Sequence, residues 1–190
     1  MADGQIFNIY NPVFMSCYFA AKKNGEVAQI QILWHTILRA WFPPIAHGGC
    51  KIMVKSLAEV NNEKPVGIVL EVWLVESSPD GNPEVFIETP ILMVACKGCG
   101  FNMPSGWEDA TQQLIRHVEN YSSGSTKMCT AVAMGTEVDI YDWEHRGGKS
   151  SLQRIHAGRL DVGHAEDRIA LETIMQQVKS RMERNLGSAT

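Results

Sequence analysis

The stretch PILMVACKGCG, residues 90–100, is the point around which the rest of the sequence can be organised. An apolar run leads into Lys97, and glycines at 98 and 100 then interrupt the pattern. A run of apolar and β-branched residues that ends at glycine predicts a strand buried on both faces. A buried strand seldom ends on a lysine unless the charge has a use there. Residues 90–97 therefore predict a central strand and a candidate functional position.

The segment before this strand predicts its hairpin partner. PVGIVLEVWLVE, residues 65–76, is rich in β-branched and aromatic side chains, and SSPDGNPE, residues 77–84, carries turn residues. We therefore expect an antiparallel hairpin over residues 66–97. A two-residue loop at DG would place Val66 opposite Ala95, whereas a three-residue loop would shift the register by one. Both registers stay open.

The flanking segments predict helices around a sheet. Apolar residues at helical spacing predict helices over 25–44, 106–121 and 164–184, the last with Ile169 facing inward. Shorter apolar runs predict further strands at 50–55, 127–135 and 137–144, followed by a polar, basic loop over 145–159. This order predicts an α/β fold with a mixed central sheet flanked by helices. We expect one domain over 1–190, with its core at about 26–185.

Composition restricts the partners that we expect. The chain has 190 residues and a formal net charge of −4. Nucleic-acid-binding proteins are usually basic, so nucleic-acid binding is expected to be weak or absent. No apolar run is long enough to span a membrane. Five cysteines, an odd number, and the absence of a signal-peptide pattern indicate an intracellular protein, cytoplasmic or nuclear, whose oligomeric state the sequence leaves open.

An ordered series of motifs resembles one nuclease superfamily. WHTILRAWFPP, VGIVLEVWLVE, PILMVACK, GWEDATQQLIRHVENY and AVAMGTEVDIYDWE follow one another over roughly residues 30–183. The series resembles the restriction-endonuclease-like, PD-(D/E)xK, superfamily, and is most similar to its fungal members. The resemblance implies a central mixed sheet with the active site at the strand that ends in lysine.

In that superfamily two acidic residues hold a divalent metal and a lysine orients or activates water. The resemblance assigns the lysine to Lys97. It assigns the strand acid to Ala95 and the first acid to about Val66, and neither side chain can bind a metal. Glu71 and Glu88 lie several residues away along their strands, so neither replaces the missing acids. We therefore expect a degenerate motif with no metal and no cofactor.

A candidate site nevertheless remains around the lysine. Gln113 and His117 share a helix face because they are four residues apart, and the resemblance turns this face towards Lys97. Histidine is a suitable acid or base near neutral pH. The expected cleft combines Lys97, Gln113 and His117 as catalytic residues with Trp107, Ala95 and Val66 as ligand-binding walls. The alternatives are a strand-end lysine that reaches solvent and a solvated polar edge of the helix.

Two further features have simple alternatives. Cys96 and Cys99 form a single C-x-x-C motif, which we interpret as two unlinked thiols because no second pair is present at zinc spacing. The basic segment is interpreted as a solvated loop, with phosphate contact as the alternative. Its cations are Arg146, Lys149, Arg154 and Arg159.

Three classes of function follow from these observations. The favoured one is a non-nucleolytic protein whose former active-site cleft binds or transforms a small organic ligand, since an apolar floor suits an organic group better than a phosphate. The first alternative is a non-catalytic module that binds protein or nucleic acid. The second is a divergent metal-dependent nuclease. Whether the chain is an enzyme stays open, because fold does not decide function.

Overall fold

The computed structural model describes residues 11–44, 49–57, 67–78, 85–121 and 126–187. Among these residues no helix has the length and apolarity needed to cross a bilayer. The elements follow in the order α1 (Pro12–Asn24), α2 (Val27–Trp41), β1 (Gly49–Leu57), β2 (Gly67–Ser77), β3 (Phe86–Lys97), the 3-10 turn η1 (Cys99–Phe101), α3 (Pro104–Glu119), β4 (Thr126–Met134), β5 (Glu137–Arg146), β6 (Lys149–Arg154), β7 (Leu160–Asp161) and α4 (Ala165–Gly187).

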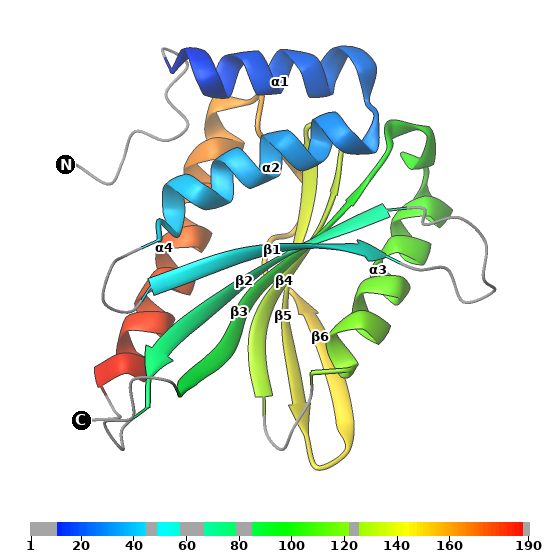
Figure 1. The fold of residues 1–190 in the computed structure, drawn as a ribbon. Helices are drawn as coiled ribbons and strands as arrows, with labels where there is room; N and C mark the ends of the chain where they lie inside the picture. The colour runs from blue at the N-terminus through cyan, green and yellow to red at the C-terminus, as the bar shows by residue number, and fades with distance from the viewer. Residues whose placement is uncertain (1–10, 45–48, 58–66, 79–84, 122–125, 188–190) are drawn as a thin grey trace.

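The strands form one mixed sheet in the order β1-β2-β3-β4-β5-β6, with β7 beside β5. The neighbours β3 and β4 are parallel, and the other paired strands are antiparallel. A parallel pair needs a crossover connection, and α3 provides it. The predicted α/β fold, a mixed central sheet flanked by helices, is confirmed (Figure 1).

Helices cover both faces of the central strands. On one face α1, α2 and α4 pack around a cluster that includes Trp34 and Leu171, and on the other α3 packs around Val69, Ala95 and Trp107. The central strands are therefore buried on both sides, which explains why they appear in the sequence as continuous apolar runs.

The hairpin of β2 and β3 has neither of the two expected registers. Val69, not Val66, lies opposite Ala95, and a bulge at Ile91 on β3, between the pairs Val72–Leu92 and Trp73–Pro90, shifts the pairing by one residue. Val66 itself lies outside the described residues. Both expectations assumed a turn of two or three residues, whereas β2 ends at Ser77 and β3 begins at Phe86. The longer connection and the bulge together account for the difference.

Three expectations about peripheral segments are wrong. The core does not begin at about residue 26, because α1 buries Phe14 and Tyr18 within it. The segment 145–159 is not a continuous loop, since it contains strand β6. Ile169 does not face inward, because α4 turns Leu171 to the core and leaves 64% of Ile169 exposed.

Candidate functional site

Lys97 ends β3 on the side of the sheet that α3 covers, and only 3% of its surface is exposed. Its Nζ donates a hydrogen bond to Gln113 Oε1 at 2.6 Å and lies 5.6 Å from the centre of the Phe101 ring. Gly67 lies opposite and makes room for the lysine stem, since a Cβ there would stand 3.0 Å from Lys97 Cδ. A strand-end lysine that reaches solvent is therefore excluded, and Lys97 and Gln113 are brought together.

Ala95, which the nuclease resemblance assigns to a metal-binding acid, lies at an apolar and closed position; Val66, the other assigned position, lies outside the described residues. Ala95 and Val69 are opposite each other and fully buried. Trp107 belongs to the same buried cluster, and its indole N–H donates to Asn102 Oδ1 at 2.8 Å. Ala95 and Trp107 are therefore parts of the core beneath α3, and they do not line the wall of an open cleft.

His117 contacts a residue that the sequence did not single out as functional, the buried carboxylate of Glu71 on β2. His117 Nε2 lies 2.6 Å from Glu71 Oε1, and 15% of the His117 side chain is exposed. An ionised carboxylate can only accept, so Nε2 carries a proton, and Nδ1 is the ring nitrogen that this contact leaves unused. In the sequence, the feature that could have pointed to this contact is Glu71 itself, a carboxylate in the middle of the apolar run VGIVLEVWLV.

Glu71 is fully buried and receives four hydrogen bonds. Oε1 accepts from His117 and from the hydroxyl of Tyr121 at 2.9 Å. Oε2 accepts from the indole N–H of Trp73 at 2.9 Å and lies 3.1 Å from Lys55 Nζ. Lys55 also hydrogen-bonds Tyr121, and 37% of its side chain is exposed. We call Glu71, His117, Tyr121 and Lys55 the Glu71 cluster; it ties β1 and β2 to α3.

The electrostatics of this cluster fix a negative charge inside the protein. Burial raises the pKa of Glu71, but hydrogen bonds from His117, Trp73, Lys55 and Tyr121 outweigh it and lower the pKa to about 2. The carboxylate is therefore ionised at neutral pH. An ionised carboxylate that orients a partly exposed imidazole is an arrangement suited to proton transfer, or to hydrogen bonding of a ligand through Nδ1.

The Lys97–Gln113 pair and the Glu71 cluster lie on one flank of α3. Gln113 and His117 are one helical turn apart, and Gly67, opposite Lys97, is four residues from Glu71 along β2. At ~3.3 Å per residue, these two strand positions are about 13 Å apart. The buried pair Val69 and Ala95 lies between them, so an apolar stretch separates two polar groups.

Acid titration should reveal the Glu71 carboxylate. Its pKa is about 2 in the folded protein and 4.5 without the fold, so its contribution to stability is complete above pH 4.5 and is lost as the pH falls towards 2. At ~1.4 kcal/mol for each tenfold change in proton affinity, the loss is about 3 kcal/mol. Urea unfolding at several pH values should show that the free energies of unfolding of the wild type and of Glu71→Gln converge by this amount as the pH falls from 4.5 towards 2. A pH-independent difference would contradict the assignment.

The predicted basic segment is largely engaged in structure. Arg154 forms an ion pair with the buried carboxylate of Asp139, and the Arg159 guanidinium stacks 4.3 Å from the Trp107 ring centre. Arg146 and Lys149 are paired residues at the turn between β5 and β6, and both are exposed. All four cations are exposed to solvent, and Arg154 and Arg159 in addition have these partners.

The two cysteines of the C-x-x-C motif are separate thiols. Cys96 is buried in the cluster beneath α2, whereas Cys99 is exposed in η1. Burial raises the pKa of both thiols, which disfavours the reactive thiolate. Across the described residues no three His, Cys, Asp or Glu side chains are grouped so as to hold a metal ion.

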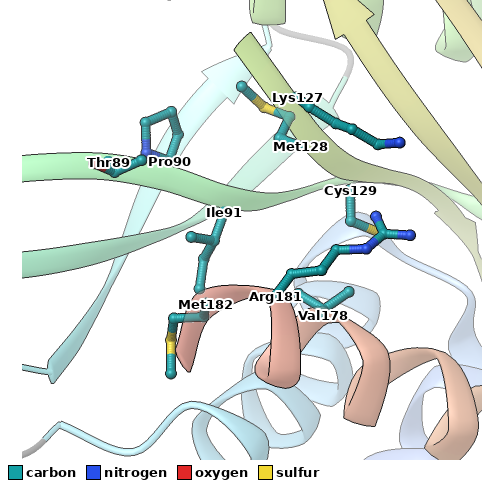
Figure 2. A pocket seen from close by; sticks show the side chains of 9 residues that line it. All are labelled: Thr89, Pro90, Ile91, Lys127, Met128, Cys129, Val178, Arg181 and Met182. Carbon is teal, nitrogen blue, oxygen red and sulfur yellow. The ribbon is translucent and has the colours of Figure 1, made fainter. Parts of the chain in front are cut away.

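A pocket opens where β3 and β4 diverge, with α4 as its floor (Figure 2). Its volume is about 50 Å³, well below the ~300 Å³ at which small-molecule sites begin. Its guanidinium, Arg181, is already bound by Asp142 at 2.5 and 3.1 Å. This pocket is therefore not a candidate for an organic ligand. Its lining comprises Thr89, Pro90, Ile91, Lys127, Met128, Cys129, Val178, Arg181 and Met182.

Comparison of the chain with family models, with curated proteins and with solved structures gives no match. The resemblance to the restriction-endonuclease-like superfamily therefore rests on the motif series of the sequence. The structure shows how the candidate residues are arranged. The Lys97–Gln113 pair and the Glu71 cluster lie along one side of α3, with the apolar residues Val69 and Ala95 between them.

Proposed function

We propose that this chain is a non-nucleolytic protein on a restriction-endonuclease-like scaffold, and that the α3 flank binds or transforms a small organic ligand. The order of α2, the antiparallel strands β1, β2 and β3, the crossover helix α3 and the parallel strand β4 supports the scaffold. The strand lysine of the motif, Lys97, points to the α3 side, as that scaffold requires.

The loss of nuclease chemistry follows from the two closed positions. Divalent metals such as Mg²⁺ require oxygen ligands from carboxylates, and the facing residues on β2 and β3 are Val69 and Ala95. Glu71 is committed to four donors and is fully buried, so its oxygens are not available to a metal. A lysine that remains without its acids no longer has a metal-bound water to orient.

The observation that carries the ligand proposal is the hydrogen bond between buried Glu71 and partly exposed His117. A charge buried at this cost is retained where its partner needs a fixed orientation. Glu71 accepts from Nε2 of His117, so Nδ1 is the ring nitrogen left to hydrogen-bond a ligand. Lys55, also partly exposed, adds a cation for an anionic substituent of the same ligand.

A thermal-shift screen of small polar organic compounds, including carboxylic acids, tests the proposal. Compounds that raise the melting temperature of the wild type should lose this effect in His117→Gln, which removes the imidazole ring and with it Nδ1. They should keep it in His164→Gln, because His164 is highly exposed and directly precedes α4, which packs on the face of the sheet opposite to α3. Ligands that stabilise all three proteins equally would place the binding site elsewhere.

Nuclease assays should be negative. With Mg²⁺ or Mn²⁺ present, the purified protein is expected to leave single- and double-stranded DNA and RNA intact, since no carboxylate stands at Val69 or Ala95. A Lys97→Ala variant is the matched control for contaminating activity. Cleavage that requires metal and disappears in Lys97→Ala would refute the non-nucleolytic proposal.

A further inference from the structure

Strand β1 is an edge strand of the sheet that the described residues form. Among the described residues, β1 pairs with β2 on one side and has no strand on the other. It is nine residues long, and Val54 near its centre is 48% exposed. An edge strand of this length presents unpaired backbone N–H and C=O groups, which an extended peptide can pair with.

A pocket lies at the beginning of this same strand, between β1 and the end of α2. Its volume is about 240 Å³. Its apolar floor consists of Phe42 and Cys50, both buried, together with Ile52. Residues Arg39, His35, Lys51 and Pro44 complete the lining, which contains no acidic side chain.

The available cation at this pocket is Arg39. Lys51 is committed elsewhere, because its ammonium is paired with Glu88 on the opposite face of the sheet. Burial and the nearby guanidinium of Arg39 lower the pKa of His35, so His35 is expected to be neutral and to act as a hydrogen-bond donor or acceptor. Arg39 is exposed, so it can turn to meet a carboxylate with two parallel hydrogen bonds.

We propose that the open edge of β1 binds an extended peptide that runs antiparallel to β1, and that its C-terminal carboxylate binds Arg39. An antiparallel strand beside β1 ends near Gly49, where the pocket lies, so its C-terminus arrives beside Arg39 and His35. Its last side chain, an apolar one, enters the pocket against Phe42. Backbone pairing gives affinity in this mode, and the pocket and the carboxylate give specificity.

The size and the charge of the pocket both favour the C-terminus of a bound peptide as its occupant. A volume of about 240 Å³ is below that of typical drug-sized sites, but it accommodates one apolar side chain with its carboxylate. A lining with a guanidinium and no carboxylate complements a single negative charge. This site faces α2, on the other side of the sheet from the Glu71 cluster, so it is independent of the function proposed above.

Binding to a library of hexapeptides with varied last residues tests the inference. Each peptide is synthesised with a free carboxylate, as the C-terminal amide, and with backbone N-methylation on alternate residues. We expect peptides with an apolar last residue and a free carboxylate to bind, and both modified forms to bind at least about tenfold more weakly. Arg39→Glu should abolish binding without changing the melting temperature, because Arg39 is exposed.

Arg116→Glu is the matched charge reversal, since Arg116 is exposed on α3 across the sheet. It should bind the same peptides as the wild type. The inference is overturned if no peptide of the library binds, if the amides bind as well as the acids, or if Arg39→Glu binds normally. Selection of amidated peptides with an internal aspartate or glutamate would likewise refute capture of the C-terminus.

Discussion

Replacing Glu71 with leucine is expected to lower the free energy of unfolding by about 3–5 kcal/mol, the range observed when one partner of a buried charged pair is removed. The leucine would leave the Trp73 indole N–H and the Tyr121 hydroxyl without their acceptor, and each unsatisfied buried donor costs about 1–3 kcal/mol. Lys55 and His117 would lose the charge that orders them.

Urea unfolding at neutral pH measures this effect. Glu71→Gln is the graded control, because it keeps the shape and one acceptor oxygen and should lose less stability than Glu71→Leu. Glu144→Leu, which alters another glutamate of the same sheet, on β5, should change stability little because Glu144 is partly exposed. A loss below ~1 kcal/mol in Glu71→Leu would mean that the cluster does not hold α3 to the sheet.

Introducing a carboxylate at Ala95 should be equally damaging. Ala95 is fully buried beneath α3, so Ala95→Glu places a charge in the core without a partner, and we expect a loss of about 3–5 kcal/mol. Ala95→Val is the steric control, with a smaller loss of about 1–3 kcal/mol from overpacking. Thermal and urea unfolding distinguish the two variants.

The double variant Val69→Asp with Ala95→Glu tests the nuclease-like scaffold. If these facing positions are the former metal ligands, excess Mg²⁺ or Mn²⁺ should raise the melting temperature of the double variant and leave that of the wild type unchanged. Val69 is chosen because it, and not Val66, faces Ala95 in the register of β2 and β3. Metal that fails to stabilise a folded double variant would argue against the superfamily resemblance.

Much of the fold could be predicted because its central elements carry strong periodic patterns. The helices α2 and α3 have clear apolar faces, and the central strands are apolar on both sides. The periphery was harder to predict. Strand β6, KSSLQR, is polar on both faces because it lies at the sheet edge, and α1 mixes exposed and buried apolar residues such as Phe19 and Phe14.

The site could be predicted only in part, because its assembly depends on tertiary contacts. Lys97 and Gln113 meet as expected from the helix spacing and the strand end. The role of Glu71 was missed because Glu71 was considered only as a replacement for the missing acids, and it lies several residues from their positions. The next turn of α3 carries His117 to Glu71 instead, and no local pattern reports that contact. The register was missed because a bulge leaves no mark in a run of apolar residues.

Nuclear magnetic resonance of the His117 ring is the most direct test of the central claim, that the Glu71–His117 pair forms a ligand site. The ring protons of His117 would be followed while compounds from the thermal-shift screen are added to the full chain, with His164 as the internal reference. The proposal predicts that stabilising compounds shift the His117 signals in a saturable way and leave those of His164 unchanged. Compounds that bind and stabilise the protein without moving the His117 signals would contradict it.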